Sequence, residues 1–492
     1  MTACTALALL AVTIACRTAA EPTRPPLLAL PSVAALQKDI DAILAEPALE
    51  HSYWGLVVKS LRTEETLYAF NARKLMMPAS NMKIVTLAAA AERLGWNYTY
   101  ETQIFAAGDI DAGTLRGDLV VAGTGDPSII AADADALFGE WAERLKGAGI
   151  RVIAGRIIGD DDAFDDSGLG FGWSWDDLPD DYAAAVSALQ FNENTVRVTV
   201  TPGAAAGDWA AISVDPPGSM LEVVSTATTG AAGADAAPAL RTHRLPGSMR
   251  LTIDGSIPAA HRPATLAVSV DNPTLFFVSA LRQSLIAHGI DVRGAAVDID
   301  DIDDAPPRSG TPIASHRSPP LSTLAVRLMK ISQNLYAETL LKTLAPSAPR
   351  TSEGGRAEAA AILERWGISS DALIQRDGSG LSRYDYVTPE ALVTILTHVD
   401  RDARLRAPFE AALPIAGRDG TLANRLKGTA AEGNARAKTG SMSNVRGLSG
   451  YLTTAGGEPL VFSILANNFE VPASTINDAA DKIVLRLVMF SR

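Results

Sequence analysis

The sequence predicts an α+β protein in which an antiparallel sheet is flanked by helices and carries a large, mostly β insertion. Three observations indicate this class. Two strand-like segments near the N-terminus and three near the C-terminus are short, apolar and separated by turns. Segments with a helical periodicity of 3.6 residues lie between these groups, mainly after residue 273. Residues 97–264 are instead a series of short β-like runs rich in Gly, Asp and Thr.

The chain has 492 residues, which is too long for one hydrophobic core, so about two to four domains are expected. We expect the first part of the sheet domain at residues 21–96, the inserted modules at 97–264 and the second part of the sheet domain at 265–492. The net charge of −13 disfavours nucleic acid or an anionic surface as a partner.

Residues 1–20 resemble a signal peptide, with an apolar run at residues 7–14 and small residues up to Ala20. Both cysteines, Cys4 and Cys16, fall inside this segment, so cleavage after Ala20 would leave no thiol. As an alternative, Cys16 is the attachment site of a lipid anchor. No later apolar run is long enough to form a transmembrane helix. We therefore expect an exported protein of the periplasm or cell envelope.

The N-terminal part of the sheet domain is predicted to begin with a helix at residues 33–44, after a proline-rich leader. Two strands at 53–61 and 66–70 flank a short polar turn and form a predicted hairpin. A buried helix then starts near Ser80, because apolar residues follow it at helical spacing: Ile84, Leu87, Ala88, Ala91 and Leu94.

The insertion is predicted to consist of one or two mostly β modules. One amphipathic helix interrupts it, marked by Leu137, Trp141 and Leu145. Residues 225–239, rich in Ala, Gly and Thr, are expected to form a surface loop. The β-like runs include residues 102–106, 119–122, 151–159, 196–200 and 211–214.

The remainder of the chain is predicted to be helical and then to return to the sheet. A polar linker is expected at residues 298–318. Predicted helices lie at residues 275–288, 321–344 with one interruption, 352–366, 389–398 and 477–490. Predicted strands lie at residues 435–441, 447–454 and 459–467.

The start of the Ser80 helix is a candidate nucleophilic site. Pro78 breaks the incoming chain, and Lys83 lies three residues after Ser80 on the same helical face. Burial in an apolar helix lowers the pKa of a lysine, and a neutral amine beside a hydroxyl acts as a general base. The helix N-terminus adds N–H groups that stabilise an oxyanion. A capped helix with a lysine that extends to solvent is the alternative interpretation.

Two later segments contain further polar residues that are candidates for the same site. Ser332-x-Asn334 interrupts a helix and indicates a turn that points two polar side chains the same way, although an ordinary N-cap has the same pattern. Lys438-Thr439-Gly440 lies on a predicted edge strand. A cation with a hydroxyl donor suits a carboxylate, and Gly440 leaves room for a ligand backbone. A solvated edge strand is the alternative here.

The order of these three motifs resembles that of the penicillin-recognising serine enzymes. The long insertion between Ser80-x-x-Lys83 and Ser332-x-Asn334 resembles the class C low-molecular-mass penicillin-binding proteins, the D-alanyl-D-alanine carboxypeptidase/endopeptidase family. Further similar segments are residues 117–119, 123–127, 377–383, 420–425 and 428–430. The resemblance implies a β-lactamase/transpeptidase-like domain interrupted by the inserted modules.

The resemblance also implies roles for individual residues. Ser80 is the acylated nucleophile and Lys83 its base, while Ser332 passes a proton to the leaving group. Asn334 holds the substrate amide. Lys438 and Thr439 bind the terminal carboxylate, and the N–H groups of Ser80 and Ser441 form the oxyanion hole. Other expected substrate-binding residues are Gly440, Arg383, Met442 and Ser443, with Asp165 as the aspartate that meets an amine of the substrate side chain.

The implied activity is that of a serine-type D-Ala-D-Ala carboxypeptidase, a DD-endopeptidase, or both, acting on peptidoglycan stem peptides and inhibited by β-lactams. Two alternatives stay open: a β-lactamase, and a non-catalytic protein that binds β-lactams or the cell wall. The chemistry needs no cofactor. The six histidines have no metal-ligand spacing, so no metal site is expected.

Overall fold

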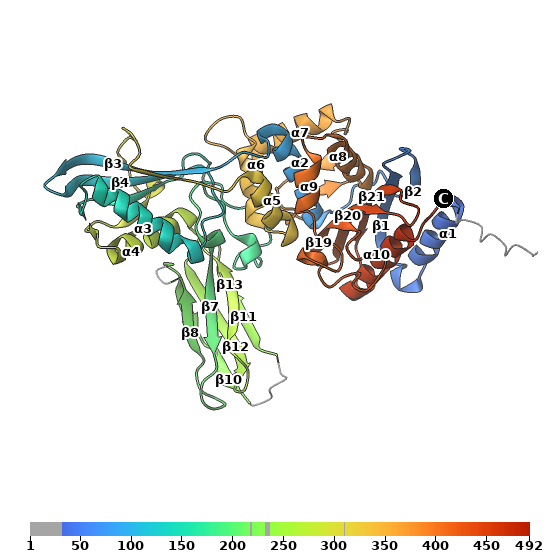
Figure 1. Cartoon of the computed structure of the whole chain (residues 1–492). Coiled ribbons are helices and arrows are strands. Elements are labelled where there is room, and N and C mark those ends of the chain that lie inside the picture. Colours follow the sequence, from blue (N-terminus) through green and yellow to red (C-terminus); the bar gives the residue numbers. More distant parts are fainter. Residues whose placement is uncertain (1–31, 217–218, 232–236, 309) are drawn as a thin grey trace, which may run out of the picture.

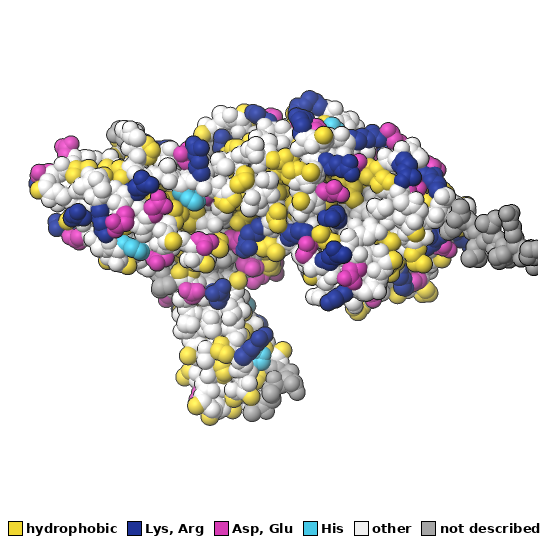
Figure 2. Space-filling model, in the orientation of Figure 1, with side chains coloured by type: hydrophobic (Ala, Val, Ile, Leu, Met, Phe, Trp, Pro, Cys, Tyr) yellow, Lys and Arg dark blue, Asp and Glu magenta, His cyan; other side chains and the backbone are white. Residues whose placement is uncertain are grey.

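The computed structural model describes residues 32–216, 219–231, 237–308 and 310–492, so the expected signal peptide and Cys16 lie outside it. Figure 1 shows a sheet domain that contains both described ends of the chain and two further modules that extend from it. On the face shown in Figure 2, acidic and basic side chains are interspersed over the surface.

The sheet domain is built on a five-stranded antiparallel sheet with the order β19-β20-β21-β1-β2. The N-terminal hairpin forms one edge, and the three C-terminal strands complete the sheet. Each central strand is almost wholly buried, because helices cover both faces. The strands are β1 (Tyr53–Ser60), β2 (Thr66–Phe70), β19 (Arg436–Met442), β20 (Val445–Thr453) and β21 (Pro459–Asn467).

Two helices from opposite ends of the chain cover one face of this sheet. α1 (Val33–Leu44) packs beside α10 (Ala473–Val488), as Figure 1 shows. Their apolar faces, including Leu36, Ile40 and Ile483, share a core with the sheet. This packing joins the two ends of the described chain into one domain.

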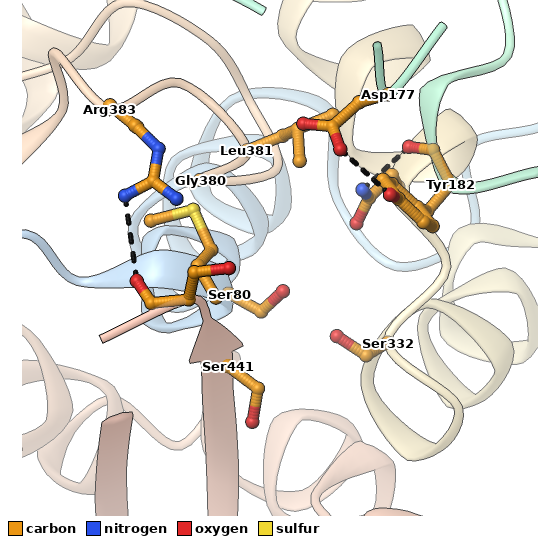
Figure 3. Close-up of a pocket in the computed structure, with 11 residues that line it drawn as sticks. Ser80, Asp177, Tyr182, Ser332, Gly380, Leu381, Arg383 and Ser441 are labelled. Carbon is orange, nitrogen blue, oxygen red and sulfur yellow. Dashed lines mark hydrogen bonds between the residues drawn. The ribbon is translucent and has the colours of Figure 1, made fainter. Parts of the chain in front are cut away.

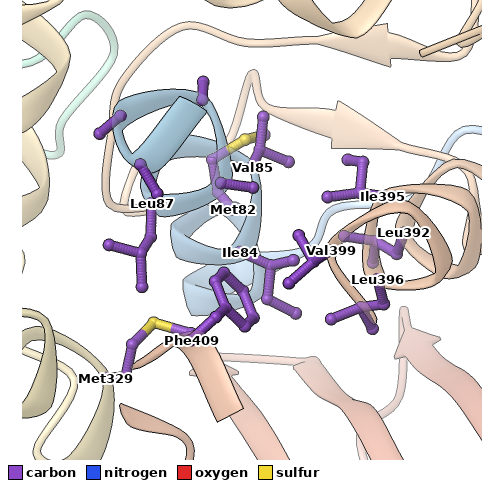
Figure 4. Close-up of a cluster of buried hydrophobic side chains, with 14 of the residues drawn as sticks. Met82, Ile84, Val85, Leu87, Met329, Leu392, Ile395, Leu396, Val399 and Phe409 are labelled. Atoms are coloured by element: carbon purple, nitrogen blue, oxygen red, sulfur yellow. The ribbon is translucent and has the colours of Figure 1, made fainter. Parts of the chain in front are cut away.

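The opposite face is covered by a helical layer around α2 (Met82–Leu94). Residues 82–91 of α2 are all buried. Ile84 lies near Val399, Leu396 and Phe409, as Figure 4 shows. A helix with buried residues on every side is a core element, which holds its first turn firmly.

The surrounding helices are α5 (Leu321–Lys330), α6 (Asn334–Thr343), α7 (Ser352–Arg365), α8 (Pro389–Arg401) and α9 (Arg406–Ala412). A two-stranded ribbon, β17 (Leu373–Ile374) and β18 (Tyr386–Val387), borders this layer.

The first inserted module contains a seven-stranded mixed sheet and two helices, α3 (Ala131–Gly147) and α4 (Pro273–Ala287). Its longest pair is an antiparallel hairpin of β3 and β4, which extends to the left in Figure 1. The strands are β3 (Glu101–Asp111), β4 (Thr114–Gly123), β5 (Val152–Ile153), β6 (Ile157–Asp160), β14 (Asp291–Val292), β15 (Ala296–Asp298) and β16 (Ala314–Arg317).

The second module is wholly β and projects downward in Figure 1. It combines a three-stranded sheet, β13-β7-β8, with a four-stranded sheet around β12. The strands are β7 (Thr195–Thr201), β8 (Ala211–Asp215), β9 (Glu222–Ser225), β10 (Thr228–Gly230), β11 (Ala239–His243), β12 (Arg250–Pro258) and β13 (Ala264–Ser269).

The expected return to the sheet domain at residue 265 divides the first module. β16 pairs with β3, with Ala314 opposite Ile104, and α4 packs on β6 and β15. The segment 298–318, expected to be a linker, therefore ends in a strand of the inserted sheet. We propose 101–317 as the inserted region, with the second part of the sheet domain starting at α5.

The predicted α+β class, the N-terminal hairpin and the three C-terminal strands are confirmed. The interruption expected in the helix at 321–344 is also present, because α5 ends at Lys330 and α6 begins at Asn334. In the described part of the chain, the structure contains no helix with the length and apolar character needed to cross a membrane.

Candidate active site

Ser80 lies at the start of α2, in a single 3-10 turn (Ala79–Asn81) that leads into the helix. The preceding segment is held to the sheet, because the Asn467 side chain accepts from the Met77 N–H at 2.8 Å and donates to the Met77 carbonyl at 3.1 Å. Ser80 is half-buried and follows Ala79, which has a φ of 45°. The turn thus presents one hydroxyl at the edge of a rigid helix.

Lys83 is fully buried, and its Nζ lies 2.8 Å from Ser80 Oγ. The same amine donates to Asn334 Oδ1 at 2.6 Å and to the Ser379 carbonyl at 2.9 Å. Burial lowers the pKa of Lys83 to about 7, although three nearby carboxyl groups oppose this shift. An amine with this pKa is partly neutral near pH 7 and can accept the Ser80 proton.

Ser332 and Asn334 lie at the junction of α5 and α6. Ser332 has a φ of 65°, a left-handed conformation that is unfavourable for a residue with a Cβ. Asn334 donates to the Tyr182 carbonyl at 2.7 Å, so its amide bridges Lys83 and the inserted module. The tight turn predicted from the sequence is present.

Lys438 is fully buried on β19, and its Nζ lies 2.8 Å from Ser332 Oγ. Burial, with the charge of Lys83 as the second cause, holds the pKa of Lys438 well below its usual range. Thr439 is largely buried, and its Oγ1 lies 2.7 Å from the Thr421 hydroxyl. The strand therefore supplies an amine that faces Ser332 and a hydroxyl beside it.

A pocket of about 370 Å³ opens above these groups. Figure 3 shows Ser80, Ser332 and Ser441 around the same open space, with Arg383 on one side and Asp177 on another. The pocket is lined by Ser80, Asp177, Tyr182, Ser332, Asn334, Gly380, Leu381, Arg383, Ser441, Met442 and Ser443. Lys83 and Lys438 lie behind Ser80 and Ser332, so the structure brings the three predicted motifs together.

Gly440 packs closely against the turn that carries Ser80. A Cβ at this position would approach the Pro78 carbonyl oxygen to 2.6 Å and Asn81 Nδ2 to 2.8 Å. The space on the Cβ side of Gly440 is thus filled by the turn that carries Ser80, while β19 remains an edge strand of its sheet. The glycine allows β19 to pack against this turn.

Asp165 does not line the pocket, which contradicts its expected contact with the substrate. Its carboxylate accepts from Lys342 Nζ at 2.6 Å, and the Lys342 side chain is only 2% exposed. Phe164 adds a contact, with its ring centroid 5.6 Å from this amine. Asp165 therefore neutralises a buried cation where the insertion meets α6.

Asp177 and Tyr182 line the pocket and were not predicted from the sequence. The Tyr182 hydroxyl lies 2.8 Å from a carboxylate oxygen of Asp177 and 2.8 Å from one of Asp180. In the sequence, Asp177 follows an acidic segment at residues 160–166 and lies two residues after Trp175, which is the only signal available. Nothing in the local pattern shows that this segment crosses to the sheet domain.

One group of carboxylates in the described ranges has oxygens close enough to hold a cation: Asp161, Asp298 and Asp300, with ligand atoms within 4.8 Å of one another. Burial is the largest cause that raises the pKa of Asp298 to about 6, followed by the charge of Asp161. None of the three lines the pocket. The Asp161 carboxylate already accepts from Ser187 and Thr274.

Comparisons with known proteins agree with this geometry. The model of the D-Ala-D-Ala carboxypeptidase 3 (S13) family matches residues 36–487. The D-alanyl-D-alanine carboxypeptidase of Actinomadura sp. (strain R39) is 36% identical over 472 residues, which cover 93% of this chain and 85% of the relative.

Two crystal structures of penicillin-binding protein 4 (dacB) from Haemophilus influenzae are also similar. One is 26% identical, with a TM-score of 0.81, and the match covers 92% of this chain and 99% of the other. The second, complexed with a novel β-lactam, is 25% identical with a TM-score of 0.74, and covers 92% and 100%. The resemblance read from the motifs is confirmed: the chain belongs to the D-Ala-D-Ala carboxypeptidase 3 (S13) family, and it is a class C low-molecular-mass penicillin-binding protein.

Proposed function

We propose that the protein is a serine-type DD-peptidase that cleaves the D-Ala–D-Ala bond of peptidoglycan stem peptides, as a carboxypeptidase, an endopeptidase or both. The observation that carries this proposal is the 2.8 Å contact between Ser80 Oγ and the Nζ of a fully buried Lys83, at a pocket shared by all three motifs. The activity printed for the Actinomadura relative supports the same reaction class.

In the acylation step, Ser80 Oγ attacks the carbonyl carbon of the penultimate D-Ala, and neutral Lys83 takes the hydroxyl proton. The carbonyl oxygen becomes an oxyanion in the tetrahedral intermediate. The backbone N–H groups of Ser80 and Ser441 are the proposed donors to this oxygen. Asn334, which accepts from Lys83, holds the amine in line with the nucleophile.

Collapse of the intermediate breaks the peptide C–N bond and leaves an ester on Ser80. The departing D-Ala nitrogen takes a proton from Ser332, and the proton removed from Ser80 replaces it. The contact between Lys438 Nζ and Ser332 Oγ orients this hydroxyl. Water then hydrolyses the ester and restores free Ser80.

Recognition of the substrate uses two sides of the pocket. Lys438 and Thr439 on β19 bind the terminal carboxylate, since an amine and a hydroxyl both donate hydrogen bonds to it. On the acyl side, we propose Asp177 in place of Asp165 as the partner of an amine on the stem-peptide side chain. Its position in the pocket lining and its carboxylate charge support this assignment.

We propose that β-lactams acylate Ser80 by the same route, because the similar structure from H. influenzae was solved as a complex with a β-lactam. Since peptidoglycan lies outside the cytoplasmic membrane, we also propose that the protein is exported and acts in the periplasm or cell envelope. A lipid anchor at Cys16 is the alternative to release after residue 20.

The test is intact-protein mass spectrometry after incubation with penicillin, followed by peptide mapping and an assay for D-Ala release. We expect a stable adduct on the Ser80 peptide and D-Ala release, both lost in Ser80→Ala. Consumption of penicillin without an adduct would favour the β-lactamase alternative. An intact antibiotic without any adduct or D-Ala release would favour the non-catalytic binding protein.

A further inference from the structure

Three buried carboxyl groups lie near Lys83, and none of them lines the pocket. Glu338 belongs to α6, one turn after Asn334, and Asp377 and Asp385 belong to the loop at residues 377–385. Their exposed fractions are 4%, 1% and 0%. Buried carboxyl groups are costly unless they are hydrogen-bonded, so each position needs a structural reason.

Glu338 holds the backbone of this loop through both of its oxygens. Oε2 accepts from the Gly378 N–H at 2.8 Å, and Oε1 accepts from the Ser379 N–H at 2.7 Å. The carbonyl of Ser379 in turn accepts from Lys83 Nζ at 2.9 Å. Glu338 is therefore linked to the candidate base through a single residue of backbone.

The rest of the loop is fixed in the same manner. Asp377 accepts from the Gly380 N–H at 2.7 Å, from the Ser382 N–H at 2.6 Å, and from Trp173 Nε1 of the insertion at 2.9 Å. Gly380 has a φ of 84°, and a Cβ there would lie 1.9 Å from the Ala79 carbonyl oxygen. The loop thus presses directly on the residue before Ser80.

We propose that Glu338 is a positioning residue for the Ser80–Lys83 pair. Its carboxylate aligns the two N–H groups that orient the Ser379 carbonyl toward the Lys83 amine, and it places a negative charge behind this amine. The inference deepens the proposed function, because it rests on Lys83 as the base. Two N–H donors on two separate oxygens match an ionised carboxylate, which accepts at both.

The charge of Glu338 has a consequence that depends on pH. The groups that face Lys83 are Glu338 on α6, Asp377 and Asp385 in the loop, and Lys438 on β19. Burial raises the pKa of Glu338, with Asp377 as the second cause, while the two N–H donors lower it. Each carboxylate favours the charged form of Lys83, so loss of one lowers the pKa of Lys83 further.

The test uses two substitutions at Glu338 in the full chain, with a chromogenic β-lactam as the acylation probe. Glu338→Gln keeps the size and removes the charge, whereas Glu338→Asp keeps the charge and withdraws the oxygens by one methylene. We expect both to slow acylation by about 10- to 100-fold, since small displacements of reacting groups have effects of this size. Only Glu338→Gln should move the acidic limb of the rate profile to lower pH.

Glu458→Gln is the matched control, because Glu458 is also buried (4% exposed) and its Oε1 accepts from Ser60 at 2.5 Å, far along the sheet. It should change thermal unfolding without altering the acylation rate or its pH profile. Equal rates and profiles for wild type and Glu338→Gln would overturn the inference. If Glu338→Gln does not fold, a wild-type rate in Glu338→Asp would overturn it. Absence of acylation in wild type would instead refute the proposed function.

Discussion

At the scale of single residues, the pocket depends on a lysine that is kept partly neutral by burial. The pKa of Lys83 is lowered to about 7, so its amine is protonated at lower pH and neutral at higher pH. A general base acts in its neutral form, and the acylation rate should therefore rise with pH up to about 7 and then level off. Below this value it should fall about tenfold per pH unit.

Lys83→Arg keeps a positive charge at this position but removes the general base, because a guanidinium stays protonated in proteins. We expect acylation by penicillin to be abolished at every pH, while the far-UV circular dichroism spectrum of the protein stays the same as that of wild type. Stopped-flow measurement of the acylation rate between pH 5 and 9 checks both statements. A rate independent of pH in wild type, or normal labelling of Lys83→Arg, would contradict the assignment of Lys83 as the base.

Thr439 offers a second test at this scale. Thr439→Val keeps the shape of the side chain and removes the hydroxyl that faces Thr421. Loss of one hydrogen bond to a carboxylate costs about 1.5–3 kcal/mol, or roughly a 10- to 150-fold lower kcat/KM for a D-Ala-terminated peptide. The same peptide with an amidated C-terminus is the control, since it has no carboxylate to lose. An equal loss for both peptides would place Thr439 outside carboxylate recognition.

At the scale of elements, the turn before α2 is held between two glycines. Gly440 lets β19 approach Pro78 and Asn81, and Gly380 lies against the Ala79 carbonyl. Gly380→Ala should displace the Ser80 turn, lower the free energy of unfolding and suppress penicillin labelling. Gly428→Ala is the control, because Gly428 has a similar φ of 73° and no atom within 4 Å of the added Cβ.

Gly428→Ala should lower the free energy of unfolding only by the strain of a left-handed backbone, about 1–2 kcal/mol, and should leave acylation unchanged. Chemical denaturation and adduct formation measured on both variants make the comparison. If Gly380→Ala were acylated at the wild-type rate, the contact of the loop with Ala79 would have no part in presenting Ser80.

The elements differ in how far their local sequence encodes them. The hairpin, the C-terminal strands and the break before Asn334 are encoded in local patterns, and these were predicted. β5 and β14 have two residues each, which is too short for any periodicity. β16 pairs with β3 across some two hundred residues of chain, so neither strand alone reveals the pairing.

At the scale of the whole molecule, the insertion completes the pocket. Tyr182 accepts from Asn334, Trp173 donates to Asp377, and Asp177 lines the pocket opposite Ser80. The chemistry of the three motifs was recognisable from residue types and order. The contribution of Asp177 was not, because it depends on how a distant module packs against the sheet domain.

This arrangement assigns different tasks to two aspartates of the same module. Asp165 neutralises Lys342, whose side chain is almost wholly buried, so Asp165→Asn leaves an unpaired cation. Removal of one partner of a buried pair costs about 3–5 kcal/mol. The Asp165 side chain is 30% exposed, and the Asp165 carbonyl still accepts from Lys342 Nζ at 2.9 Å after the substitution. Asp165→Asn should therefore lower the free energy of unfolding by less than this amount, while leaving kcat/KM unchanged for folded enzyme.

Asp177→Asn should instead lower kcat/KM and leave the stability of the protein almost unchanged. The half-buried carboxylate contacts no buried cation among the residues that the structure describes, so thermal unfolding should change little. For a stem peptide with a free side-chain amine, kcat/KM should fall about five- to tenfold, the size of a single partly exposed charge contact of about 1 kcal/mol. N-acetylation of that amine removes the charge from the substrate, so wild type and Asp177→Asn should then be equal. A loss that persists with the acetylated peptide would mean that Asp177 shapes the pocket through Tyr182 without meeting the amine.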